Sequence, residues 1–294
     1  MFTITHFNKY ATRVAVVSLL ISAVITAHAA SVWKVSSDTH SVFIGGTIHI
    51  LAPEDYPLPK EYEKAFAAAS TVVFETDMAA VNSLAFQQTM TAKMTYSDGT
   101  TIDQVLNAST YTALHQHLTL RQIPTASVAS MKPSLLAMTL SVIELQRMGF
   151  TSIGVDQYYA NLAGEKGKAQ AWLESPEEQI TFLANMGNGD ENAMIEYSLQ
   201  DIENMPETIG QLRSTWLAGD MPGMAAVAIE PFKADYPVIY QDLLVTRNNN
   251  WLPKIESMLK DDAVELILVG ALHLAGPDSL LSSLAAKGYK VEKL

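Results

Sequence analysis

Two segments near opposite ends of the chain share one design and constrain the fold more than any other feature. Residues 42–49 (VFIGGTIH) and 266–273 (LILVGALH) each begin as an apolar run rich in β-branched side chains and end in Gly-x-x-His. Such runs predict β-strands, and open α/β sheets place ligands and chemistry just beyond the strand ends. Because the segments are far apart in the sequence, only the fold can bring His49 and His273 together.

Two imidazoles that meet in this way suggest either a metal site or a general-base pair. The alternative is that each histidine is a hydrogen-bonded structural residue behind its strand, which is the commoner situation for a single Gly-x-x-His. Two copies in matching strand contexts, among only seven histidines in the chain, make a functional pair a serious hypothesis.

Five strand-like segments end in side chains that can carry chemistry. These side chains are His49, Glu75, Asp156, Glu174 and His273. Strands that alternate with helices predict an α/β fold with a mostly parallel central sheet, whose carboxyl edge would gather all five. The alternative for a carboxylate is a cap on the next helix, above all for Glu174, whereas Glu75 directly follows an apolar run that predicts partial burial.

An N-terminal β-hairpin and a large helical insertion complete the predicted fold. Residues 31–36 alternate like a strand, turn-forming residues 37–40 follow, and a second strand begins at Ser41. The pattern is mostly helical from about residue 78 to 150. We therefore expect one domain over residues 30–294 that contains this insertion.

Two further expectations concern the region before the second Gly-x-x-His motif. Residues 219–237 are rich in Gly, Pro and Met and predict a mobile connection. Residues 238–259 predict a helix that is broken around Asn248–Asn250 and again at Pro253.

Charge and cysteine content exclude several classes of partner and site. The 294-residue chain has a formal net charge of -12 and no clusters of Lys or Arg, which argues against nucleic acid and anionic membrane surfaces. The chain contains no cysteine. A metal site would therefore use His and carboxylates, which suit zinc, manganese, cobalt or iron.

Residues 1–29 are expected to form a cleaved signal peptide. Lys9 and Arg13 precede the apolar run 14–25, and Ala27-His28-Ala29 fits an A-x-A cleavage signal. An uncleaved anchor is the alternative. Cleavage near Ala29 predicts an exported, periplasmic protein that is not held at the membrane.

The cluster Arg247-Asn248-Asn249-Asn250-Trp251 is the other unusual feature. An arginine with neighbouring amides suits the binding of a carboxylate or a carbonyl, so Arg247 and Asn248 are predicted to bind substrate. The alternative is a polar turn between two helices.

An ordered set of short motifs resembles the TraB/GumN family, which is related to the Tiki proteases and more distantly to erythromycin esterases and haem-binding ChaN proteins. The set comprises Gly46-Thr47-Ile48-His49, Phe74-Glu75-Thr76-Asp77, Lys132-Pro133, Gly154-Val155-Asp156, residues 173–179, Arg247-Asn248 with Trp251, residues 270–274, and Gly288-Tyr289. The resemblance implies a mixed α/β fold with paired Gly-x-x-His motifs at its site. By similarity to Tiki proteins, it also implies divalent-metal-dependent peptidase activity, with manganese or cobalt favoured.

The first hypothesis is therefore a periplasmic metal-dependent hydrolase of peptide or amide bonds. His49, His273 and Glu75 would bind the ion, which is manganese, cobalt or zinc. A metal-free variant, in which His49 is the base and Glu75 orients it, is also possible.

Three other residues have roles in this hypothesis. Glu174 or Asp156 would serve as general base or as an orienting group, and Arg247 would hold a substrate carboxylate or stabilise the oxyanion. The second hypothesis is a periplasmic binding protein that captures a peptide signal or haem without chemistry.

Overall fold

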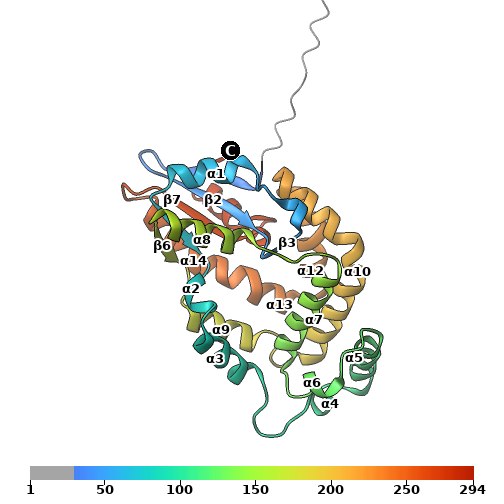
Figure 1. Ribbon diagram of the computed structural model, residues 1–294. Helices are drawn as coiled ribbons and strands as arrows, with labels where there is room; N and C mark the ends of the chain where they lie inside the picture. The colour runs from blue at the N-terminus through green and yellow to red at the C-terminus, as the bar shows by residue number, and fades with distance from the viewer. Residues whose placement is uncertain (1–29) are drawn as a thin grey trace, which may run out of the picture.

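The computed structural model describes residues 30–294, so the predicted signal peptide lies outside the described residues. The fold is mixed α/β, as predicted, and is built on one mostly parallel sheet (Figure 1). In spatial order its strands are β6 (Ala169–Trp172), β4 (Thr71–Phe74), β7 (Glu265–Gly270), β2 (Ser41–Thr47), β1 (Val32–Ser36) and β8 (Lys290–Lys293).

The register of the sheet brings the two Gly-x-x-His segments side by side. Strands β2 and β7 pair in parallel with Thr47 opposite Gly270, so both motifs leave the sheet at one edge. Strands β4 and β6 continue the parallel order on the other side of β7. Strands β1 and β2 form the predicted N-terminal hairpin, and β8 pairs antiparallel with β1.

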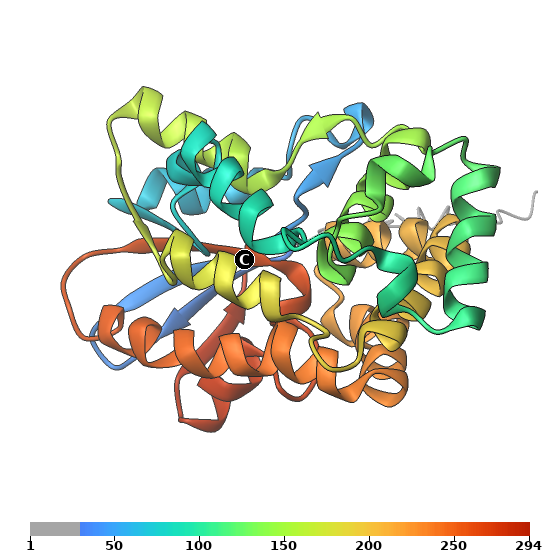
Figure 2. The same ribbon diagram turned by 90° about the horizontal axis from the view of Figure 1, so that it is seen from below.

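Helices cover both faces of the sheet because its central strands are apolar on both sides (Figure 2). Helices α1 (Lys60–Ala68) and α8 (Val155–Lys166) cover one face, where a Cβ at Gly45 would touch Tyr62 of α1. On the other face a Cβ at Gly46 would touch Ala271 and Leu274 in the short helix η4 (Ala271–Leu274). Helices α14 (Arg247–Met258) and α15 (Leu280–Ala286) lie on this second side.

The predicted helical insertion has its own hydrophobic core. Its helices are α2 (Met78–Val81), α3 (Leu84–Met94), α4 (Ile102–Val105), α5 (Ala108–Leu120), α6 (Thr125–Val128) and α7 (Pro133–Arg147). Leu114, Leu118, Leu136 and Leu140 pack there against the long helix α10 (Glu191–Ala218), away from the sheet (Figure 1). No helix within residues 30–294 combines the length and apolar character needed to cross a membrane.

The expectation of a mobile connection over residues 219–237 is wrong, because this segment is helical. It consists of α11 (Met221–Met224), the π-helix η2 (Ala225–Ile229), α12 (Glu230–Asp235) and the start of α13 (Pro237–Tyr240). Pro222 and Pro237 lie in first helical turns, where no backbone N–H is required, whereas Pro231 directly follows the π-helix η2 within one continuous helical run. Its apolar residues, among them Met224, Ile229 and Phe232, are buried in the main core.

The expected break near residues 248–250 is also absent. The π-helix η3 (Gln241–Thr246) runs directly into α14, and Pro253 lies inside that helix. Trp251 and Ile255, one turn apart, are fully buried and hold α14 against the sheet. Tertiary packing here outweighs the poor helix propensity of three consecutive asparagines.

The strand-like segment before Asp156, residues 151–155, was expected to belong to the central sheet, and this expectation is wrong. Strand β5 (Ser152–Ile153) is short and pairs with β3 (Ile50–Leu51) in a separate two-stranded sheet. Strand β3 directly follows His49. Asp156 therefore reaches the site from the first turn of α8, not from the end of a central strand.

Candidate active site at the sheet edge

All five predicted strand-end side chains and Arg247 gather at the carboxyl edge of the sheet. The guanidinium of Arg247, at the first position of α14, lies at the centre of the buried part. Its Nη2 atom donates to Glu75 Oε2 at 2.6 Å and to Glu174 Oε1 at 2.7 Å, and its Nε donates to Glu174 Oε2 at 3.2 Å. One cation therefore bridges the ends of strands β4 and β6.

Two aromatic rings lie close to this guanidinium. The ring of Trp251 lies 4.5 Å from the Arg247 Cζ atom, and the ring of Phe182 in α9 (Pro176–Asn185) lies 5.3 Å from it. Trp251 Nε1 also donates to Glu174 Oε2 at 3.1 Å. Burial alone would lower the pKa of Arg247, but the two carboxylates outweigh it and hold the pKa above its usual value.

The two glutamates differ in their electrostatic state. Burial acts to raise the pKa of Glu75, but Arg247, the nearby histidines and the Gly270 N–H, 2.7 Å from Oε1, together hold it well below its usual range. For Glu174, burial outweighs the Arg247 contacts and raises the pKa. Glu75 is therefore ionised at physiological pH, whereas Glu174 is the more readily protonated of the two.

His273 is sealed inside the protein. Its side chain is 5% exposed, and its ring packs on Trp251 with centroids 4.5 Å apart. Its Nδ1 lies 2.7 Å from Asn248 Oδ1, and its Nε2 lies 3.3 Å from Arg247 Nη1 and 3.8 Å from Glu75 Oε1. Burial lowers the pKa of His273 to about 3, so the ring is neutral at physiological pH.

His49, in contrast, faces solvent, with 60% of its side chain exposed. Its Nδ1 lies 3.2 Å from Asp156 Oδ1, and the charge of Asp156 raises the pKa of His49 above its ordinary value. The Asp156–His49 pair has the arrangement in which a carboxylate orients an imidazole and stabilises its protonated form.

Gly154 explains how Asp156 reaches His49. A Cβ at Gly154 would lie 2.3 Å from the backbone oxygen of His49, so no other residue fits without moving the chain. Val155 N donates to Ile48 O at 3.1 Å. The Gly-Val-Asp motif is thus a close backbone contact that presents the carboxylate to the imidazole.

The two imidazoles and Glu75 converge around Gly270. A Cβ at Gly270 would lie 3.3 Å from Glu75 Oε1 and 3.6 Å from both His49 Nε2 and His273 Cδ2. The two rings predicted from opposite ends of the sequence therefore line one site, with one ring buried and one open to solvent.

The residues fit a divalent ion in kind but not in their present positions. Both histidines have Nδ1 next to an oxygen, as metal-binding histidines usually do. However, no group of three or more His, Asp and Glu side chains in residues 30–294 is arranged to hold a metal ion. The guanidinium of Arg247 lies against Glu75 and His273, where the ion would need to bind.

Three contacts of the site were not predicted from the sequence. The first is made by Asn248, which is 4% exposed and contacts His273 and the backbone, whereas the sequence predicts a substrate-binding role for it. Trp251 lies one helical turn after Arg247, a spacing that could have signalled their contact. Phe182 comes from another helix, and no local pattern points to it.

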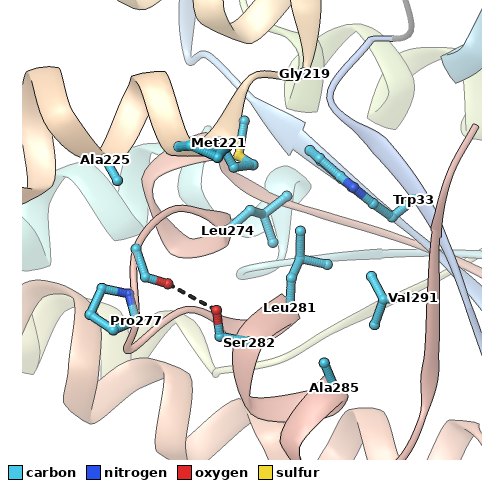
Figure 3. A pocket seen from close by; sticks show the side chains of 12 residues that line it. Trp33, Gly219, Met221, Ala225, Leu274, Pro277, Leu281, Ser282, Ala285 and Val291 are labelled. Atoms are coloured by element: carbon cyan, nitrogen blue, oxygen red, sulfur yellow. Dashed lines mark hydrogen bonds between the residues drawn. The ribbon is translucent and has the colours of Figure 1, made fainter.

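A separate cavity of about 520 Å³ lies beside η4 and the start of α15 (Figure 3). Its lining is largely apolar and includes Trp33, Met221, Leu274 and Leu281. None of the six site residues lines it. It therefore lies apart from the polar chemistry at the sheet edge.

Comparison with known proteins gives one result. The model of the TraB/PrgY/gumN family matches residues 31–293, which is nearly the whole chain. No curated protein and no solved structure matched the chain.

Proposed function

Since the chain belongs to the TraB/PrgY/gumN family, we propose that it is a hydrolase that cleaves peptide or amide bonds at this sheet edge. The observation that carries the proposal is the convergence of His49, Glu75 and His273 around Gly270, with Arg247 bound between the glutamates. Such a set of base, carboxylates and fixed cation suits attack of water on a carbonyl.

His49 is the general base in this proposal. Its Nε2 atom would take a proton from water as the water attacks the carbonyl carbon, and would then pass that proton to the leaving nitrogen. Asp156 beside Nδ1 stabilises the imidazolium that forms in between. The exposure of His49 supports this role, because substrate and water can reach it directly.

Arg247 would stabilise the negative charge that develops on the carbonyl oxygen. A guanidinium has five N–H donors, and four contacts to Glu75, Glu174 and His273 leave one Nη1 hydrogen free within the described residues. The two glutamates hold the group rigidly, so little reorganisation is needed during the reaction.

A metal-dependent form of this reaction is the second candidate. It is supported by the Nδ1 contacts of both histidines, which leave the Nε2 atoms as the ones that would bind an ion. His49, His273 and Glu75 would hold manganese, cobalt or zinc, and a bound ion would polarise the carbonyl and activate water. Arg247 would first have to release both Glu75 and His273 Nε2.

The location and the substrate belong to the same proposal. Lys9, Arg13 and the apolar run 14–25 support export through a signal peptide and action in the periplasm. A peptide or another small amide is the proposed substrate. The acidic chain supports neither nucleic acid nor an anionic membrane as partner.

Profiling with a peptide library tests the proposal. The wild-type protein, with and without chelator, is compared with His49→Gln, and we expect cleavage by the wild type and a loss of at least about 100-fold in the variant. Activity that survives the chelator supports the metal-free form, whereas loss that manganese restores supports the metal-dependent form. Haem or peptide binding without any cleavage would support the binding-protein hypothesis instead.

A further inference from the structure

Asn248 lies behind the site and makes contacts that fix the orientation of its side-chain amide. It is the second residue of α14 and is 4% exposed. Its Nδ2 atom donates to the backbone oxygen of Asp278 at 2.9 Å and to that of His273 at 3.5 Å. Because the nitrogen faces these two acceptors, Oδ1 is the atom that faces the His273 ring.

This orientation determines where the proton of His273 resides. Asn248 Oδ1 can only accept a hydrogen bond, and it lies 2.7 Å from His273 Nδ1. The hydrogen must therefore be on Nδ1, which leaves a lone pair on Nε2. Arg247 Nη1, 3.3 Å from Nε2, is a donor that matches this lone pair.

We propose that Asn248 is a positioning residue that holds His273 in the Nδ1–H tautomer, so that the Nε2 lone pair anchors Arg247 Nη1. In the opposite tautomer, an Nε2–H group would face an N–H of Arg247, and Asn248 Oδ1 would face a lone pair. Both contacts would then be lost. The proposed tautomer does not depend on the proposed function, whereas its catalytic consequence rests on that function.

The consequence for catalysis follows from the anchored Nη1 atom. When one of its hydrogens is bound to His273, the direction of the other is fixed as well. Under the proposed function, that second hydrogen would donate to the carbonyl oxygen under attack. Asn248 thus acts through His273 and Arg247 without touching substrate. Its loss should lower kcat and leave KM nearly unchanged, because the interaction concerns charge that develops only in the transition state.

Two variants separate this role from simple tethering of the segment after His273. Asn248→Leu removes both the acceptor and the donor. Asn248→Asp keeps an acceptor for His273 Nδ1 but loses the donor to the Asp278 oxygen. If Asn248 only tethers that segment, the two variants should behave alike. If it fixes the tautomer, Asn248→Asp should retain what Asn248→Leu loses.

The test is nitrogen NMR of the histidine rings in the full chain at pH 7.5, with the His273 signals assigned by their absence in His273→Gln. We expect a protonated Nδ1 and an unprotonated Nε2 in the wild type and in Asn248→Asp. In Asn248→Leu we expect the Nε2–H tautomer to become populated. Circular dichroism and thermal melting establish that each variant is folded.

Two results would overturn the proposal. One is a wild-type His273 that carries its proton on Nε2, and the other is a folded Asn248→Leu protein with an unchanged tautomer. Because the spectra need no substrate, a tautomer as expected together with a failure to cleave any peptide would reject only the proposed hydrolase. If Asn248→Leu does not fold, the wild-type spectrum can still overturn the proposal, because a proton on His273 Nε2 would contradict it.

Discussion

Arg247 and Glu75 are separated by 172 positions in the sequence and joined by a hydrogen bond of 2.6 Å. The bond ties the first turn of α14 to the end of β4, and both side chains are about nine-tenths buried. A buried ion pair contributes little net stability when intact, but removal of one partner leaves an uncompensated charge in the interior. The site is therefore also a point on which the stability of the fold depends.

Replacement of Arg247 should destabilise the protein strongly. We expect Arg247→Met to lower the free energy of unfolding by about 3–5 kcal/mol, because Glu75 and Glu174 lose their shared cation. Urea denaturation at pH 7.5 measures the effect. Lys290→Met is the control, since the Lys290–Glu292 pair is largely exposed, and it should change stability by less than about 1 kcal/mol. Similar values for the two variants would contradict the buried network.

Addition of one methyl group at Gly270 should impair the site more than the fold. The new Cβ of Gly270→Ala would lie 3.3 Å from Glu75 Oε1, which is tighter than an ordinary contact, so Glu75 would have to move by a few tenths of an ångström. The same Cβ would fill the space beside His49 Nε2, 3.6 Å away. We expect turnover to fall about 10- to 100-fold. The matched control is Gly210→Ala in α10, where nothing lies within 4 Å of the new atom, and it should keep full activity. Full activity of Gly270→Ala would show that neither the present position of Glu75 nor the open space at Gly270 is required.

The pH dependence of cleavage should report the Asp156–His49 pair. Asp156 raises the pKa of His49, and the base must be deprotonated to act, so activity should rise with pH through a value above 6.5. In Asp156→Asn this rise should shift to lower pH, toward 6.5, and the activity at the high-pH plateau should fall by about tenfold or more. Profiles of kcat/KM from pH 5 to 10 measure both changes. An unshifted rise would exclude His49 as the base.

Stability in mild acid should depend on His273. Its folded-state pKa, lowered to about 3 by burial, lies below the ordinary 6.5, so the unfolded chain binds more protons as pH falls below 6.5. Between pH 8 and 5 the free energy of unfolding of the wild type should therefore fall by about 2 kcal/mol more than that of His273→Gln. Urea denaturation of both proteins across this window measures it. Glu75 does not contribute there, because the stability linked to its lowered pKa is lost only below about pH 4.5. Parallel curves for the two proteins would contradict a buried neutral His273.

The convergence of the site could be predicted because it follows from local pattern and sheet geometry. The runs before His49, Glu75 and His273 are apolar and short, and parallel strands deliver their ends to one edge. Asp156 was predicted near the site by an incorrect route, since its position depends on the contact of Gly154 with the backbone of His49. That contact joins distant segments and leaves no periodic signal.

The helical course of residues 219–237 could not be predicted for a related reason. Glycine, proline and methionine suggest a loop when considered one at a time. The structure places Pro222 and Pro237 in first helical turns and buries Met221 and Met224 in the main core. The side chains that stabilise these helices come from elsewhere in the chain, so tertiary packing and not local helix propensity determines their conformation.

One helix joins the two hydrophobic cores, and this limits how the molecule can deform. Near its start α10 contributes Met194 to the sheet-side core, its middle contributes Ile202 and Met205 to the core of the helical insertion, and its last turns return to the sheet side with Trp216. The insertion cannot swing away from the sheet as an independent body while this helix stays straight. Pro206 interrupts the hydrogen-bond ladder of α10 just beyond Met205. A bend at that residue would not free the insertion, because Met194 before it and Trp216 after it both pack in the sheet-side core.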